Sequence, residues 1–192
     1  MKTKIAIAAS LLVGVTAFFF SCSKPAPAEA STEAVAPSTD RINMMIKDWE
    51  RAKKFTQAYL DSADDKTIDF KASPTVRSFG QQLLHLAEAN YGITQPATGK
   101  VTEMGFGKLE KDENFKTKAD VAKAVMDSYD YVIAGLKEMN DNMLAEDCKL
   151  FDMTMSKELA LNKAFEHQTH HRGQTTQYLR AQGKVPPNEM LF

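Results

Sequence analysis

Three of the four histidines of this 192-residue chain lie within five residues of one another, at positions 167, 170 and 171. Residues four apart lie on the same face of a helix, so His167 and His171 can present their imidazoles to one divalent ion. The same face adjoins Leu161 and Phe165, which predicts that it faces the interior, whereas His170 points to the polar side. The pair is a candidate for two metal ligands; the alternative is an incidental pair without a metal.

A third protein ligand would leave one coordination position open for water or substrate, which is the arrangement of catalytic zinc sites. His85 is the remaining histidine. It lies opposite the main apolar face of its predicted helix, together with Gln81 and Glu88. Periodicity therefore allows either a solvent-facing ring or a ring that faces a polar cavity. Glu88 is expected to be solvated.

The elements that must position these residues are helices, and no strand pattern competes with them. The apolar spacing predicts helices over about 40–63, 73–91, 117–139 and from 154 or 156 to 183. Ser73-Pro74 is expected to open the second helix and Gly92 to end it. Four amphipathic helices favour an all-α, four-helix bundle, with Trp49 and Tyr129 in its core. The long irregular stretch 94–116 is expected to supply substrate contacts, because long loops in compact domains are usually functional.

The N-terminus has the organisation of a secretory signal. Lys2 and Lys4 precede an apolar run over 5–20, and Cys22 follows the small residue Ser21. This junction resembles a lipobox, at which bacterial lipoproteins are cleaved and lipidated; the alternative is a conventional signal peptide. We therefore expect a signal peptide over 1–21, a lipidated Cys22 with a disordered tether over 22–39, and a folded domain over 40–192. Such a protein would be exported, lipid-anchored to a membrane and periplasm-facing.

The charge and the cysteines limit the partners of the chain. After residue 21, 22 basic and 25 acidic residues remain, a net charge of −3, and no basic patch stands out, so nucleic acid is not an expected partner. If Cys22 carries lipid, Cys148 has no intrachain disulfide partner, and burial is the common state of such a cysteine. The expected partners are a small-molecule substrate and, through the lipid on Cys22, a membrane; a homodimer is left open.

Two stretches of the sequence resemble the DinB-like (damage-inducible) metalloenzyme family. Val76–Tyr91, which reads VRSFGQQLLHLAEANY, is similar to the family's second-helix signature. His167–Gln174, which reads HQTHHRGQ and is followed by YLR and by GKVPP, resembles its C-terminal motif. The resemblance covers Asp40–Phe192, and the chain would be a lipoprotein-anchored member.

The resemblance implies an up-up-down-down four-helix bundle that holds one divalent ion through His85, His167 and His171. His170 matches a position that is not a ligand. Zinc, nickel, manganese and iron all suit three imidazoles. Characterised relatives include thiol-dependent transferases and a maleylpyruvate isomerase, but cytosolic thiols are not expected outside the inner membrane.

The predicted function is that of a divalent-metal-dependent enzyme of the hydrolase or transferase type. An ion held by three neutral imidazoles keeps its full positive charge, which lowers the pKa of a bound water or attracts a thiolate. Gln174, one turn beyond His171, would orient that water or a substrate oxygen, or would only pack between helices. The alternative function is a non-catalytic metal- or ligand-binding lipoprotein domain of the periplasm.

Overall fold

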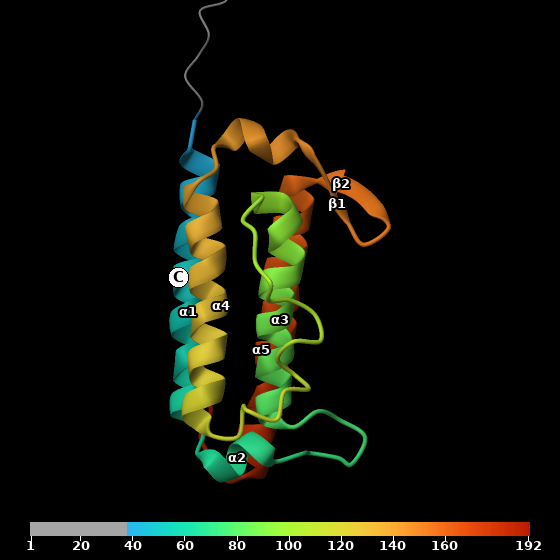
Figure 1. Cartoon of the computed structure of the whole chain (residues 1–192). Coiled ribbons are helices and arrows are strands. Elements are labelled where there is room, and N and C mark those ends of the chain that lie inside the picture. Colours follow the sequence, from blue (N-terminus) through green and yellow to red (C-terminus); the bar gives the residue numbers. More distant parts are fainter. Residues whose placement is uncertain (1–37) are drawn as a thin grey trace, which may run out of the picture. The chain divides into compact units, whose positions relative to one another are not determined.

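The computed structural model describes residues 38–192, which form a bundle of four long helices (Figure 1). The elements in chain order are α1 (Asp40–Asp61), a short α2 (Asp65–Asp69), α3 (Phe79–Thr98), α4 (Lys118–Lys137), the 3-10 helix η1 (Asp141–Ala145), β1 (Asp147–Leu150), β2 (Met153–Ser156) and α5 (Lys157–Ala181). The prediction of an all-α four-helix bundle is confirmed. The predicted signal peptide, Cys22 and most of the tether lie outside the described residues.

The four long helices run in an up-down-down-up order. Arg41 at the start of α1 pairs with Glu158 at the start of α5, so these two helices are parallel. Gly135 near the end of α4 packs against Thr98 at the end of α3, so these two are parallel as well. Figure 1 shows the two pairs running in opposite directions. The expected up-up-down-down order is wrong, because residues 99–117, hereafter the crossover segment, return along the bundle before α4 begins.

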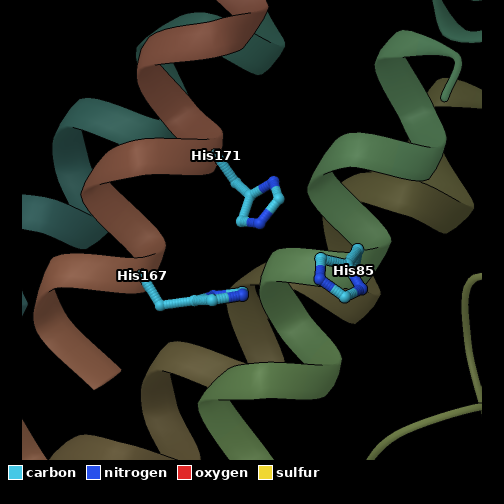
Figure 2. A group of neighbouring side chains, drawn as sticks. All are labelled: His85, His167 and His171. Carbon is cyan, nitrogen blue, oxygen red and sulfur yellow. The ribbon is translucent and has the colours of Figure 1, made fainter. Parts of the chain in front are cut away.

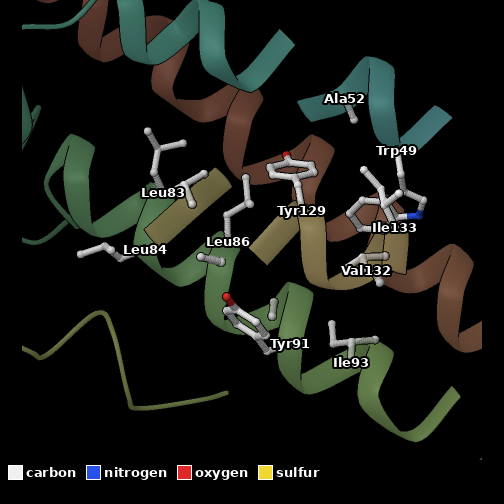
Figure 3. Close-up of a cluster of buried hydrophobic side chains, with 14 of the residues drawn as sticks. Trp49, Ala52, Leu83, Leu84, Leu86, Tyr91, Ile93, Tyr129, Val132 and Ile133 are labelled. Atoms are coloured by element: carbon white, nitrogen blue, oxygen red, sulfur yellow. The ribbon is translucent and has the colours of Figure 1, made fainter. Parts of the chain in front are cut away.

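Aromatic and aliphatic side chains from all four long helices fill the core (Figure 3). Trp49 of α1 is 1% exposed and makes edge-to-face contacts with Tyr129 of α4 and Phe165 of α5, at ring-centroid distances of 5.7 and 5.4 Å. Edge-to-face pairs at this distance are favourable beyond the area that they bury. The core positions predicted for Trp49 and Tyr129 are therefore confirmed.

The helix that carries His85 begins later than predicted. Ser73-Pro74 does not open α3, which starts at Phe79 after the N-cap Ser78. The Ser78 hydroxyl accepts a hydrogen bond from the Gln81 backbone N–H, and the Gln81 side chain accepts one from the Ser78 backbone N–H. This capping box provides acceptors for two backbone N–H groups at the start of the helix. Ser73-Pro74 would provide only one acceptor, the serine hydroxyl, together with the fixed φ of the proline.

The same helix also ends later than predicted, since it continues through Gly92 to Thr98. A Cβ atom at Gly92 would lie 2.5 Å from the ring of the exposed Phe106, so a larger residue would displace this ring of the crossover segment from α3. The actual end is Gly99, whose φ of +73° is a left-handed conformation that glycine adopts without strain. Gly92 therefore allows the crossover segment to approach α3 closely, and it does not end the helix.

The connection before α5 contains an antiparallel hairpin of two four-residue strands, which the sequence did not predict. Its strands pair Cys148 with Met155, and Phe151 adopts a positive φ of 53° at the turn. Strands this short show too few alternations to be recognised in a sequence. Cys148 is buried, as expected, and is the one free cysteine among residues 38–192.

The remaining helix ends agree with the sequence. The predicted helix start at 117 is confirmed, because Thr117 and Asp120 form a capping box there, and Ser156, one of the two predicted starts, caps α5. In the part of the chain that the structure describes, no helix combines the length and the apolar character needed to cross a membrane.

Candidate metal centre

The three histidines selected from the sequence meet at the seam between α3 and α5. His85 comes from α3, and His167 and His171 come from successive turns of α5 (Figure 2). One ring nitrogen of each lies within 4.8 Å of the corresponding nitrogens of the other two. The ring centroids are 4.4 Å apart for His167 and His171, 4.7 Å for His85 and His171, and 5.2 Å for His85 and His167. Nitrogen atoms at these separations can surround a single ion, although their role as ligands stays a prediction.

The fourth histidine lies beside the cluster and outside it. His170 is exposed, and its Nε2 is 2.7 Å from Nε2 of Gln174. The helical wheel predicted this separation, because His170 lies on the outer side of α5 while His167 and His171 face α3. The solvent-facing alternative for His85 does not hold, since its side chain is 19% exposed and its ring faces α5.

His171 is oriented by a glutamine that the sequence analysis did not single out. Its Nδ1 lies 2.7 Å from Oε1 of the buried Gln82. The Gln82 amide donates to Oε1 of Gln174 at 3.0 Å and to the hydroxyl of Tyr178 at 3.3 Å. These donations leave the Gln82 oxygen as the acceptor for His171, so the ring carries its proton on Nδ1 and presents Nε2 to the cluster. Gln174 reaches His171 through Gln82, and its predicted role toward water or substrate stays a prediction.

His85 faces two carboxylates on the side away from the other histidines. Its Nδ1 lies 3.1 Å from Oε2 of Glu110 and 4.0 Å from Oε2 of Glu88. Glu88 is 2% exposed, so the expectation that it is solvated is wrong. The reason is that its Oε1 accepts hydrogen bonds from the backbone N–H groups of Leu109 and Glu110, at 2.7 and 2.8 Å, which a buried carboxylate needs. The crossover segment is thereby attached to α3 beside the cluster.

Burial keeps the three imidazoles neutral. It lowers the pKa of His171 to about 3 and that of His167 to about 4, and the neighbouring histidines add to both effects. The pKa of His85 is also lowered, first by burial and then by the positive charge of Arg77. Metal ligands must be unprotonated, so these shifts favour metal binding at neutral pH.

The donor set fits a divalent ion of the nitrogen-binding kind. Nδ1 of His171 has an acceptor in Gln82, which leaves Nε2 as the ring nitrogen free to bind a metal, and Nδ1 of His85 lies 3.1 Å from a carboxylate oxygen of Glu110. The buried Nδ1 of His167 has no hydrogen-bond partner within residues 38–192, so its tautomer is not set by a neighbour. Three neutral imidazoles would hold zinc, nickel, manganese or iron and leave coordination positions open.

An apolar groove with a volume of about 550 Å³ adjoins the cluster. His167 lines it together with Ile93 of α3, Leu159 of α5 and the hairpin residues Phe151 and Met153. Phe151 and Met153 are 62% and 57% exposed and lie together at this groove, where they form an exposed apolar patch. A small molecule with an apolar part fits such a groove.

An all-helical bundle with a histidine cluster on the seam of two antiparallel helices is the class of protein that these observations define. The family model described as the DinB family matches residues 38–190, and the chain belongs to this family.

Two solved structures share the fold. A DinB-like protein from Bacillus cereus ATCC 10987 has 20% sequence identity and a TM-score of 0.65, over 77% of this chain and 97% of its own. A DinB-like protein from Bacillus subtilis has 16% identity and a TM-score of 0.60, over 78% of this chain and 97% of its own. The comparison with curated proteins gave no significant match.

Proposed function

We propose that this protein binds one divalent metal ion through His85, His167 and His171 and uses it as a hydrolase or transferase of small molecules. The observation that carries the proposal is the convergence of three imidazole nitrogens within 4.8 Å of one another from two helices. Membership of the DinB family supports it. When bound, the ion would act as a Lewis acid at a coordination position that the protein leaves open.

The residues around the cluster support a site that admits a substrate. His167 belongs both to the histidine cluster and to the lining of the apolar groove, so a molecule in the groove would reach the ion with one end. Gln82 holds the ring of His171 in place through its Oε1, and such a fixed ligand reduces the reorganisation that metal binding requires. We propose that Gln174 acts indirectly, by keeping the Gln82 oxygen directed at His171.

Elemental analysis of purified protein tests the metal site. The wild-type chain is expected to carry one ion, and the His171→Ala variant is expected to carry none. His170→Ala is the matched control, because this histidine is one residue away, exposed and outside the cluster. Equal metal content in all three proteins would refute the site.

Two measurements would then distinguish a metalloenzyme from a non-catalytic metal-binding domain. They are the rate of water exchange at the bound ion and a screen for turnover of thiol, ester and amide substrates. Fast water exchange together with turnover that His171→Ala abolishes would support the enzyme. Loss of the ion that unfolds the bundle, without turnover in the wild type, would favour the non-catalytic metal-binding domain.

We also propose that Cys22 carries lipid and anchors the exported domain to a membrane, facing the periplasm. The support is the order of basic, apolar and small residues before Cys22. Metabolic labelling with a fatty acid is expected to mark the wild type and not a Cys22→Ala variant. Labelling of both proteins would contradict the proposal.

A further inference from the structure

The position of one carboxylate in the crossover segment cannot be explained by packing alone. Glu110 lies beside the histidine cluster, and its Oε2 is 3.1 Å from Nδ1 of His85. Its side chain is 18% exposed, so it gives up much of its hydration to occupy this place. Such a cost is expected only where the carboxylate has specific partners.

Two other side chains direct Glu110 toward His85. Nε of Arg77 lies 2.7 Å from Oε1 of Glu110, which leaves Oε2 for the imidazole. Glu88 accepts from the backbone N–H groups of Leu109 and Glu110, and Leu109 is 1% exposed, so the backbone that carries Glu110 is held from both sides. The carboxylate is therefore positioned before any ion binds.

We propose that Glu110 is the positioning residue for His85: its carboxylate accepts the Nδ1 proton, keeps the ring in the Nδ1–H tautomer and directs Nε2 to the metal. The inference rests on the proposed metal site and deepens it. A carboxylate behind a ligating histidine fixes the ring and raises its basicity, and loss of such a partner costs about 10–100-fold in metal affinity. The crossover segment is then part of the metal centre.

A second ion among His85, Glu88 and Glu110 is the competing interpretation, since these three also offer donor atoms within 4.8 Å of one another. Their existing partners oppose it. Oε1 of Glu88 already accepts two backbone N–H groups, and Oε1 of Glu110 already binds the Arg77 cation. A second dication would face that guanidinium and would require both nitrogens of His85 to be deprotonated.

Metal affinity measured by competition with a chelator tests the proposal. Glu110→Ala is expected to bind one ion with about 10–100-fold lower affinity than the wild type. Glu110→Gln keeps the shape and one acceptor oxygen, so a smaller loss is expected, and this variant serves if the alanine variant does not fold. Glu113→Ala, an exposed acid of the same segment, is the control and is expected to leave the affinity unchanged.

Nitrogen NMR of the His85 ring in the metal-free protein gives a readout that a merely structural role would not change. The wild type is expected to show a protonated Nδ1, and Glu110→Ala is expected to shift the tautomer toward Nε2–H. Wild-type affinity and tautomer in Glu110→Ala, or two ions per wild-type chain, would overturn the positioning role. A wild-type chain that binds no ion would refute the proposed function instead, so the two failures are distinguishable.

Discussion

Replacing Glu88 with alanine is predicted to destabilise the domain through the crossover segment. The carboxylate is 2% exposed, and its Oε1 accepts from the N–H groups of Leu109 at 2.7 Å and Glu110 at 2.8 Å. A buried N–H group that loses its acceptor costs about 1–3 kcal/mol. Because Leu109 is fully buried and Glu110 is half-buried, the two losses together amount to about 2–4 kcal/mol. At about 2–4 °C per kcal/mol for a domain of this size, Tm falls by on the order of 10 °C.

Thermal unfolding of the metal-free protein measures this loss, and amide hydrogen exchange locates it. Faster exchange is expected at Leu109 and Glu110 in Glu88→Ala, because both amides lose their acceptor. Glu88→Gln keeps an acceptor oxygen in the same place and is expected to lose less. Glu113→Ala removes an exposed acid from the same segment and is the control. The reasoning is refuted if Glu88→Ala unfolds at the temperature of Glu113→Ala with unchanged exchange at Leu109.

Three further predictions concern the protonation of the histidine cluster and one hydrogen bond of the core. Because the pKa values of His167 and His171 are lowered to about 4 and about 3, the imidazoles are unprotonated at pH 7, and the calorimetric enthalpy of metal binding is expected not to depend on the ionisation enthalpy of the buffer. Affinity is then expected to fall below pH 6.5, first as protons compete for His85, whose pKa is also lowered, and further as the pH approaches about 4, where His167 becomes protonated; a complete loss already at pH 6.5 would contradict the lowered values. In the core, the Tyr129 hydroxyl lies 2.7 Å from the Thr56 hydroxyl and donates to Gln168 at 2.9 Å, so Tyr129→Phe is expected to cost about 1–3 kcal/mol in urea unfolding. An unchanged midpoint would show that water replaces the lost partner.

The inward direction of His167 and His171 could be predicted because both histidines lie on one helix, α5. His167 and His171 are four residues apart, and the helix that carries them has a readable start at Ser156 and a readable stop at Gly183. Spacing, capping and the apolar face then suffice to direct both rings inward. No tertiary information was needed for this pair.

His85 could not be placed by the same reasoning, because α3 is buried on most of its surface. The helix packs against α4 on one side and α5 on another, and its polar residues Gln82, Glu88 and Asn90 are buried along with its apolar ones. A pattern of apolar and polar positions distinguishes inside from outside only for a helix with one exposed face. The direction of the His85 ring is therefore a consequence of which helices surround α3.

The partner of His85 depends on contacts that no local pattern contains. Glu103, Glu110 and Glu113 are all acids of one irregular segment, and composition does not distinguish them. What selects Glu110 is the burial of its neighbour Leu109, the one fully buried apolar side chain of the crossover segment, together with the two N–H groups that Glu88 holds. An apolar residue in a charged stretch anchors the backbone, and the next side chain is thereby directed to the cluster. The acidity of Glu110 matters only because Leu109, Glu88 and Arg77 together place its carboxylate beside His85.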